Sequence, residues 1–192
     1  MTCLHLVRHG ETDWNVQGRW QGQADVALNA RGLAQARQSA EMLAHLPLEA
    51  IYSSDLVRAA ETARTIARAN PAPLVLEPRL REIHQGEWQG QLVKEIKAHH
   101  LDAYQRGSQD PLKIAAPGGE TTQQVRERAL AAVSGLLDRY PRGNVVVVSH
   151  GFTLAVLITH FKKISFDRVW EQIPQNGEII RLEIDRVQVD PG

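Results

Sequence analysis

The sequence predicts an α/β fold, in which helices cover both faces of a mostly parallel, mixed sheet to form a three-layer α/β/α sandwich. Short apolar runs, which suit strands buried on both faces, alternate with amphipathic helical patterns. In addition, two of these runs end in the same dipeptide, His-Gly, at residues 9–10 and 150–151. A chain of 192 residues is long enough to bury one full core, so we expect a single domain spanning residues 1–192.

The predicted strands are short, strongly apolar segments. The last of them alternates apolar and polar residues, with Ile180, Leu182 and Ile184 on one face. In chain order the segments cover about residues 3–7, 50–53, 74–76, 144–149 and 178–184.

Three helices are predicted between the strands. Asn29 is the expected N-cap of the first and Asp55 that of the second, because short polar side chains accept hydrogen bonds from the first helical N–H groups. The third covers about residues 121–140. All three have apolar residues at helical spacing. These stripes are Leu33, Ala36, Ala40 and Leu43 in the first helix, Leu56, Ala59, Ala60, Ala63 and Ile66 in the second, and Val125, Ala129, Ala132, Val133, Leu136 and Leu137 in the third.

Residues 91–119 break the alternation of strands and helices. This segment is polar, contains the pair His99-His100 together with Tyr104 and Arg106, and closes with a Pro-Gly-Gly turn. We expect a helical insertion packed over the ligand-binding edge of the sheet. His99, Tyr104 and Arg106 are candidates for contacts with a ligand, but their interpretation as surface residues is favoured.

Composition excludes several classes of partner. Lys and Arg number 22, as do Asp and Glu, so no overall field draws the protein to nucleic acid or to an anionic membrane. The longest apolar runs, 145–148 and 154–158, are far shorter than the roughly 18 residues of a membrane span. No targeting segment is evident, so we expect a cytoplasmic protein.

Cys3, the single cysteine, is expected to be buried and inert. A homodimer is compatible with the sequence.

The two His-Gly steps place candidate catalytic groups at one edge of the sheet. His9 and His150 each follow a predicted strand, and ligands of open α/β sheets bind beyond the carboxyl ends of the strands. Arg8 adds a positive charge, and Arg58 lies in the first turn of a predicted helix, where the helix amino end also favours anions. Bidentate arginine contacts suit phosphate, so the sequence indicates chemistry on a phosphate group.

These residue types suggest distinct roles. A neutral imidazole can attack phosphorus, and the neighbouring Arg8 lowers the pKa of His9, which makes His9 the preferred nucleophile. His150 is expected to be a charged hydrogen-bond donor. Glu82 and Glu87 are competing candidates for the acid that protonates the leaving alkoxide. The remaining histidines considered, His5, His45 and His160, are interpreted as structural.

Five ordered blocks, LVRHGETDWN, YSSDLVRAAETA, EIHQGEWQG, PGGE and VVVVSHG, resemble the histidine phosphatase superfamily in its phosphoglycerate mutase-like branch. The resemblance spans nearly the whole chain. Within the family, the chain resembles the small cofactor-independent phosphatases. It implies a phosphohistidine at His9 and Glu82, rather than Glu87, as the general acid. It implies no metal and no cofactor. The residues that it implies in phosphate binding are Arg8, Asn15, Gln21, Gly22, Arg58, His150 and Gly151.

Two departures bear on the substrate. Gln85 and Gln89 replace the phenylalanine and glutamate usual in the acid block, which alters the polarity of the pocket. The adjacent arginine pair with which the family's mutases hold a carboxylate is missing, and only the spaced Arg106, Arg126 and Arg128 are present. Hydrolysis of a small phosphate monoester is therefore expected, with phosphoglycerate mutase-type transfer as the alternative.

The sequence favours two further classes of function less. A non-catalytic phospholigand-binding module requires a broken catalytic set, and this set is intact. A metallohydrolase could use His99 and His100, but adjacent residues on a helix point in different directions. The substrate stays open among a cobalamin-pathway nucleotide, a phosphorylated amino acid, a sugar phosphate and a phosphoglycerate.

Overall fold

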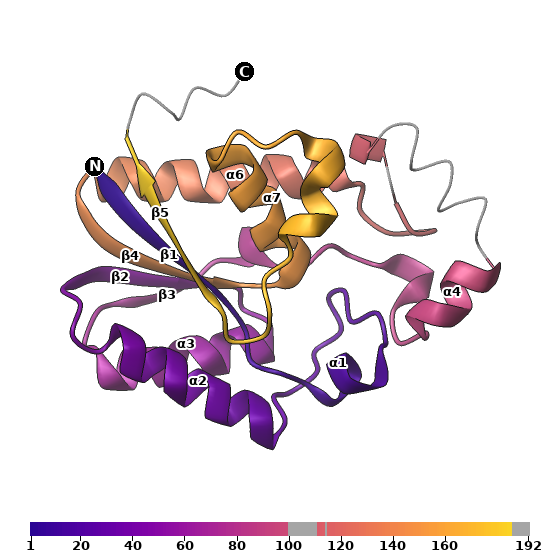
Figure 1. Cartoon of the computed structure of the whole chain (residues 1–192), viewed down its shortest axis with the longest axis horizontal. Coiled ribbons are helices and arrows are strands. Elements are labelled where there is room, and N and C mark those ends of the chain that lie inside the picture. The colour runs from indigo at the N-terminus through magenta and orange to yellow at the C-terminus, as the bar shows by residue number, and fades with distance from the viewer. Residues whose placement is uncertain (100–110, 114, 186–192) are drawn as a thin grey trace.

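The structure, a computed structural model, describes residues 1–99, 111–113 and 115–185. Its sheet has five strands in the order β3-β2-β4-β1-β5 (Figure 1). Four strands run parallel to their neighbours, and β5 runs antiparallel to β1, which confirms the mixed sheet. The strands are β1 (Thr2–Arg8), β2 (Leu48–Ser53), β3 (Leu74–Leu76), β4 (Gly143–Ser149) and β5 (Ile179–Ile184).

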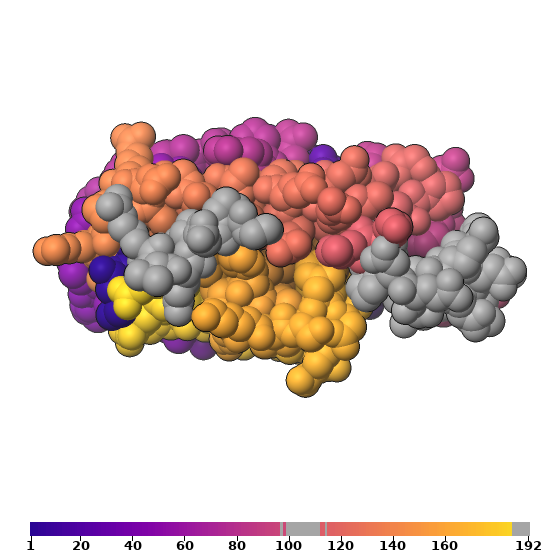
Figure 2. Space-filling model, turned by 90° about the horizontal axis from the view of Figure 1, so that it is seen from above, coloured from indigo at the N-terminus to yellow at the C-terminus, as the bar shows by residue number. Residues whose placement is uncertain are grey.

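Helices cover both faces of the sheet and confirm the three-layer sandwich. On one face lie α2 (Ala30–Leu43) and α3 (Val57–Ala69), and on the other α6 (Thr122–Arg139) and α7 (Gly151–Phe161) (Figure 1). Figure 2 shows α6 and the segment that follows β4 covering the second of these faces.

The central strand β4 explains why the predicted strands look uniformly apolar. Val145 and Val147 pack in the cluster beneath α6 and α7, whereas Val146 and Val148 pack in the cluster beneath α2 and α3. All four side chains are fully buried. Because successive side chains of a strand point to opposite faces, a strand covered on both sides needs an unbroken apolar run.

One of the two predicted helix caps is confirmed and the other is wrong. The side chain of Asn29 accepts a hydrogen bond from the Gly32 N–H at 2.8 Å and caps α2, as predicted. Asp55 does not cap α3, whose N-cap is Leu56, and instead accepts from Arg81 Nε at 2.7 Å. A charge-assisted pair with a guanidinium is stronger than a cap to a neutral N–H, so Asp55 turns to Arg81. In α2, Leu33 lies outside the apolar face and is 38% exposed.

The sequence patterns did not reveal α7. Residues Gly151 to Thr159 of this helix are all buried, so it has no polar face to give an amphipathic signal. The short α1 (Asp13–Gln17) was also missed, although Thr12 and Asn15 form a capping box at its start.

Part of the expected insertion at 91–119 is described. It contains the helix α4 (Val93–His99) and a 3₁₀ turn, η3 (Pro111–Lys113). His100, Tyr104 and Arg106 lie outside the described residues, and so does the side chain of His99. Their role against the leaving group stays a prediction.

Cys3 is half-buried rather than buried, which corrects the expectation. It pairs with Glu183 of the edge strand β5, and its Sγ lies 3.1 Å from Nε of Arg181, a side chain that is mostly exposed. The thiol, on the strand next to this edge strand, is therefore partly accessible. No helix in the described ranges has the length and apolar character needed to cross a membrane.

Candidate active site

The two predicted histidines meet at the carboxyl edge of the sheet. Arg8 pairs with Ser149 at the ends of the parallel strands β1 and β4, so the next residues, His9 and His150, lie side by side. Their ring centroids are 5.0 Å apart. This juxtaposition was expected from the two His-Gly steps.

His9 is held as a neutral imidazole. Its Nδ1 lies 2.7 Å from the carbonyl oxygen of Gly10, which can only accept a hydrogen bond, so the ring proton belongs on Nδ1. Nε2 therefore carries no proton, and its lone pair accepts a hydrogen bond from Arg58 Nε at 3.3 Å. Burial, followed by the positive charges of Arg58 and Arg8, holds the pKa of His9 well below its usual value. The arrangement gives a neutral nitrogen nucleophile near neutral pH.

Arg58 is a buried cation at the start of α3. Its Nη1 donates to the Ala24 carbonyl at 2.7 Å and its Nη2 to the Gly22 carbonyl at 2.8 Å. Burial lowers the pKa of Arg58 to about 10, although the charge of Glu82 acts in the opposite direction. The guanidinium therefore stays charged near neutral pH, fixed beside the His9 ring.

Arg8 carries an unsatisfied donor. Its Nη1 donates to the Pro174 carbonyl at 2.6 Å, while its buried Nε has no hydrogen-bond partner in the described part of the chain. Burial lowers the pKa of Arg8, and the charges of Glu82 and Glu178 oppose that effect. An unpaired buried donor costs free energy, so this group is suited to an anionic ligand.

His150 differs from the expectation of a charged donor. Burial, then the charges of Arg58 and His9, holds the pKa of His150 well below its usual value, so the ring is neutral without a ligand. Its Nε2 lies 2.8 Å from Ser54 Oγ, and its buried Nδ1 has no partner among the described residues. The correction follows from burial next to positive charge, which disfavours a second cation.

The candidate acid Glu82 sits at the amino end of α7. Its carboxylate accepts from the backbone N–H groups of Ile83 at 2.9 Å, Phe152 at 3.0 Å and Thr153 at 3.2 Å. The helix amino end favours a carboxylate there. Glu82 lines the same cavity as His9 and Arg58, whereas the competitor Glu87 is exposed and does not line it.

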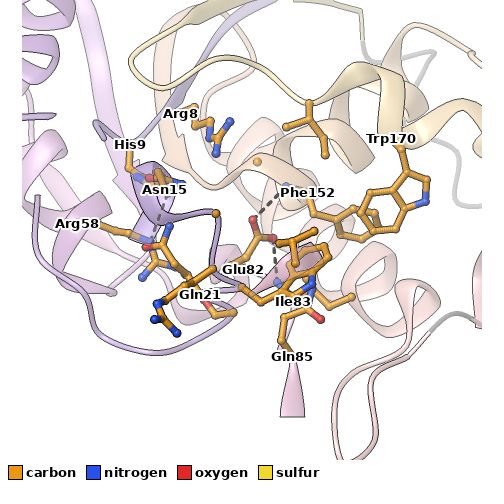
Figure 3. Close-up of a pocket in the computed structure, with 17 residues that line it drawn as sticks. Arg8, His9, Asn15, Gln21, Arg58, Glu82, Ile83, Gln85, Phe152 and Trp170 are labelled. Carbon is orange, nitrogen blue, oxygen red and sulfur yellow. Dashed lines mark hydrogen bonds between the residues drawn. The ribbon is translucent and has the colours of Figure 1, made fainter. Parts of the chain in front are cut away.

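Figure 3 shows Glu82 between two unlike groups of side chains. Arg8, His9 and Arg58 lie on one side of its carboxylate, and Phe152 and Trp170 lie on the other. All of them line one cavity of about 280 Å³. The cavity therefore has a cationic end, formed by Arg8, His9 and Arg58, and an apolar end, formed by Phe152 and Trp170.

The remaining predicted side chains differ in their position relative to the cavity. Asn15 and Gln21 line the cavity, and their side-chain oxygens lie 3.1 Å and 3.0 Å from the hydroxyl of Thr12. Their amide N–H groups are thus left to face a ligand. Thr12 itself was missed, and its place in the capping box of α1 was the available signal. His150 does not line the cavity and lies fully buried beside His9.

Two glycines permit close approaches that other residues would block. Gly22 has a φ of 51°, and a Cβ there would come within 2.9 Å of the Gln85 backbone nitrogen. Gly151 begins α7, where a Cβ would lie 3.1 Å from Ile173 Cγ2 and 3.4 Å from Arg8 Cζ. Larger residues would displace the loop beside Arg58 or the guanidinium of Arg8.

An arginine on α6 holds the acid loop. Arg128 donates through Nη1 to the Arg79 and Arg81 carbonyls at 2.7 and 2.6 Å, and through Nη2 to the Glu82 carbonyl at 3.0 Å. Its Nε donates to Glu120 at 2.8 Å. Arg128 is therefore committed to the backbone around Glu82.

Arg126 is not placed to bind a substrate carboxylate at this site, because it lines a separate cavity together with His160 and Lys163. His5 bonds to Asn144 Oδ1 at 3.1 Å and has the structural place expected. Among the described residues, no cluster of three or more His, Cys, Asp or Glu side chains is arranged to hold a metal ion.

Known proteins share this sequence and fold. The sequence model of the histidine phosphatase superfamily (branch 1) matches residues 4–190. Phosphoserine phosphatase 1 of Hydrogenobacter thermophilus is 35% identical over 170 residues, covering 88% of this chain and 81% of that protein. A metal-independent phosphoserine phosphatase of Arabidopsis thaliana is 41% identical over 162 residues, covering 82% and 67%.

Two further matches broaden the comparison. A probable phosphoglycerate mutase, GpmB, of an Enterobacter species is 38% identical over 164 residues, covering 83% of this chain and 74% of that protein. The solved structure of Bacillus stearothermophilus YhfR superimposes with a TM-score of 0.86 at 36% identity, covering 97% of this chain and 93% of the other.

Fold, site and sequence together define the class. The chain belongs to the histidine phosphatase superfamily (branch 1). Within that superfamily it is a hydrolase that acts on phosphoric monoesters, as the phosphatases among its relatives indicate.

Proposed function

We propose that this protein is a metal-independent phosphomonoesterase that acts on a small metabolite, with His9 as the nucleophile. The observation that carries the proposal is the His9 ring, whose Nδ1 proton is committed to the Gly10 carbonyl while Nε2 faces a buried cationic site. Arg8 and Arg58 supply the positive charge that a phosphoryl group requires in its transition state.

In the first step, the Nε2 lone pair of His9 attacks phosphorus and forms a P–N bond as the ester P–O bond breaks. Glu82 gives a proton to the departing alkoxide and becomes a carboxylate. The products of this step are the free alcohol and phosphorylated His9. The positive charges of Arg8 and Arg58 stabilise the equatorial oxygens during the transfer.

In the second step, water attacks the phosphoryl group and the P–N bond breaks. Glu82, now a carboxylate, accepts the proton of the attacking water, and His9 recovers its lone pair. Inorganic phosphate then leaves, and the enzyme returns to its starting state. Asn15, Gln21, Gly22 and Gly151 contribute neutral donors or open backbone around the phosphate.

His150 acts beside the nucleophile. Its Nδ1 is buried and has no hydrogen-bond partner in the described ranges, and its low pKa reflects burial among positive charges. A bound phosphate dianion adds negative charge to the same site, which favours the protonated imidazole. We therefore assign His150 as a donor that becomes charged when phosphate is bound.

Hydrolysis is favoured over mutase transfer by the arginines. Arg128 is committed to the acid loop and Arg126 lines another cavity, so neither supplies a carboxylate clamp beside His9. The relative named as a probable phosphoglycerate mutase keeps mutase transfer as the second candidate.

The test is a release assay with purified protein and chelator, using a panel of phosphate monoesters and the His9→Asn variant. We expect phosphate release from the wild type and its loss in the variant. Isomerisation of 3-phosphoglycerate that depends on a bisphosphate primer, without release, would instead establish the mutase.

Three further expectations are proposals of the same kind. We propose the expected insertion at 91–119 over the site on the basis of its described part, because Val93 of α4 lines the cavity. The exposed apolar residues Leu33, Met42, Val75 and Leu76 are compatible with a homodimer. We also expect a cytoplasmic location, which cell fractionation would test.

A further inference from the structure

The leaving-group end of the cavity is apolar. Its wall consists of Ile83, Phe152, Trp170 and Ile173, which belong to one hydrophobic cluster and line the same cavity as His9. We call these residues the apolar wall. Phe152 and Trp170 pack with ring centroids 4.6 Å apart and an interplanar angle of 36°, within the range typical of aromatic pairs.

The apolar wall is fixed to the proposed acid. Ile83 follows Glu82 in the chain, and the backbone N–H groups of Ile83 and Phe152 donate to the Glu82 carboxylate at 2.9 and 3.0 Å. An ester oxygen that takes a proton from Glu82 must lie within hydrogen-bond reach of that carboxylate. The carbon skeleton attached to this oxygen is therefore brought against the wall (Figure 3).

Charge at this end is sparse. Among the lining residues that the structure describes, Glu82 is the sole carboxylate. An ammonium group on the substrate would therefore pair with the same carboxyl group that is proposed to protonate the leaving oxygen. Besides Arg8 and Arg58 beside His9, Arg19 is the one other positively charged side chain among those lining residues, and it donates to Gln17 Oε1 at 2.9 Å and to the Gly90 carbonyl at 2.6 Å. Within the described lining, a zwitterionic leaving group therefore finds no carboxylate besides Glu82 as a counter-ion for its ammonium.

From this geometry we infer that the enzyme selects phosphate monoesters of alcohols that carry an uncharged apolar or aromatic group, over those of small zwitterionic or carboxylate-bearing alcohols. This inference rests on the proposed function. The cavity, about 280 Å³, lies near the lower end of the range of about 300–1,000 Å³ for small-molecule sites, so it suits a phosphate with one ring-sized substituent. Phosphoserine, named for two relatives, carries the opposite chemistry.

The experiment compares kcat/KM for 2-phenylethyl phosphate, ethyl phosphate, O-phosphoserine and 3-phosphoglycerate. The first two esters release alcohols of similar acidity, so their ratio reports contact of the ring with the wall. One methylene in a hydrophobic pocket changes kcat/KM by about 10–200-fold, and we expect the phenyl group to raise it at least about tenfold. A ratio near one, or a preference for either charged ester, would overturn the inference.

Variants of Trp170 locate the effect. In Trp170→Ala the ratio of 2-phenylethyl to ethyl phosphate should fall towards one, and in Trp170→Leu, which keeps apolar bulk, it should fall less. The control is Phe161→Leu. Phe161 lies at the end of α7 opposite to Phe152 and does not line the cavity, so this variant should keep the wild-type ratio. An unchanged ratio in folded Trp170→Ala would contradict a role for the wall.

The two proposals fail in different ways. If the folded wild type releases phosphate from O-phosphoserine or 3-phosphoglycerate in preference to the phenyl ester, selection by the apolar wall is wrong and the phosphatase mechanism stands. If no ester is hydrolysed, the proposed function itself is wrong.

Discussion

The two ends of the cavity contrast in how they are built. At the cationic end, Arg8, His9 and Arg58 lie at a strand end, directly after it and at a helix start, and backbone carbonyls hold them in place. At the other end, Phe152 and Trp170 supply an apolar surface that no short motif marks. Backbone contacts therefore position the cationic groups, whereas side-chain packing forms the surface that we propose selects the alcohol.

The largest expected effect removes the nucleophile. His9→Asn should lower kcat/KM for every ester by about 10³-fold or more, because loss of a nucleophile removes the covalent route altogether. Phosphate release is measured with chelator present. His160→Asn, a half-buried histidine of a separate cavity, serves as the matched control and should keep wild-type activity. Near-normal turnover by His9→Asn would refute the mechanism.

The second effect separates acid catalysis from phosphate binding. Glu82→Gln should lower kcat/KM for alkyl esters by about 10²–10⁴-fold, the range typical of general acid catalysis. For p-nitrophenyl phosphate the loss should be far smaller, because p-nitrophenolate departs without a proton. Glu87→Gln, which changes an exposed carboxylate, should alter neither value. Equal losses for both kinds of ester would remove Glu82 from the role of acid.

A smaller effect is expected at the support of the acid loop. Arg128→Met removes the donors to the Arg79, Arg81 and Glu82 carbonyls. We expect the free energy of unfolding to fall by about 1–3 kcal/mol, the cost of leaving buried polar groups unpaired. Activity should fall more for alkyl esters than for p-nitrophenyl phosphate, because Arg128 positions Glu82.

The control for that variant is Arg126→Met, which changes an arginine two residues away that lines another cavity. Urea unfolding and kcat/KM for the two kinds of ester provide the measurements. A uniform loss across both kinds of ester would make Arg128 a structural residue without a positioning role.

The smallest effect concerns pH. Burial holds the pKa values of His9 and His150 well below their usual value, so both stay neutral in the folded protein while the unfolded chain takes up protons. The free energy of unfolding should therefore fall as pH drops below about 6.5, by up to about 1.4 kcal/mol per pH unit for each histidine.

Urea unfolding between about pH 7 and about pH 5.5 measures this dependence, and His9→Asn should show a shallower slope than the wild type because one buried imidazole is gone. An identical slope in both proteins would show that His9 does not titrate differently in the folded and unfolded states.

Much of the fold could be predicted because its signals are local. The apolar strands and the helices α2, α3 and α6 follow from side-chain periodicity and from the Asn29 cap. The predictions were wrong or incomplete where tertiary contacts determine the local structure. Asp55 binds Arg81 rather than capping α3, and α7 is buried too evenly to show a period.

The site divides in the same way. Arg8, His9, Asn15, Arg58 and Glu82 sit in recognisable motifs, and the structure brings them to one cavity. The unprotonated state of His150 could not be foreseen, because it depends on burial beside Arg58. Trp170 and Ile173 also lacked a signal, since they reach the cavity from a 3₁₀ segment and the loop after it.

The most direct test of the account is to trap the phosphoenzyme. In Glu82→Gln with isotope-labelled p-nitrophenyl phosphate, the first step needs no acid while the second has lost its base, so the intermediate should accumulate. Rapid quenching and peptide mapping should place an acid-labile, base-stable phosphoryl group on His9. Label on another residue, or phosphate release with no labelled protein at any time, would contradict the covalent mechanism.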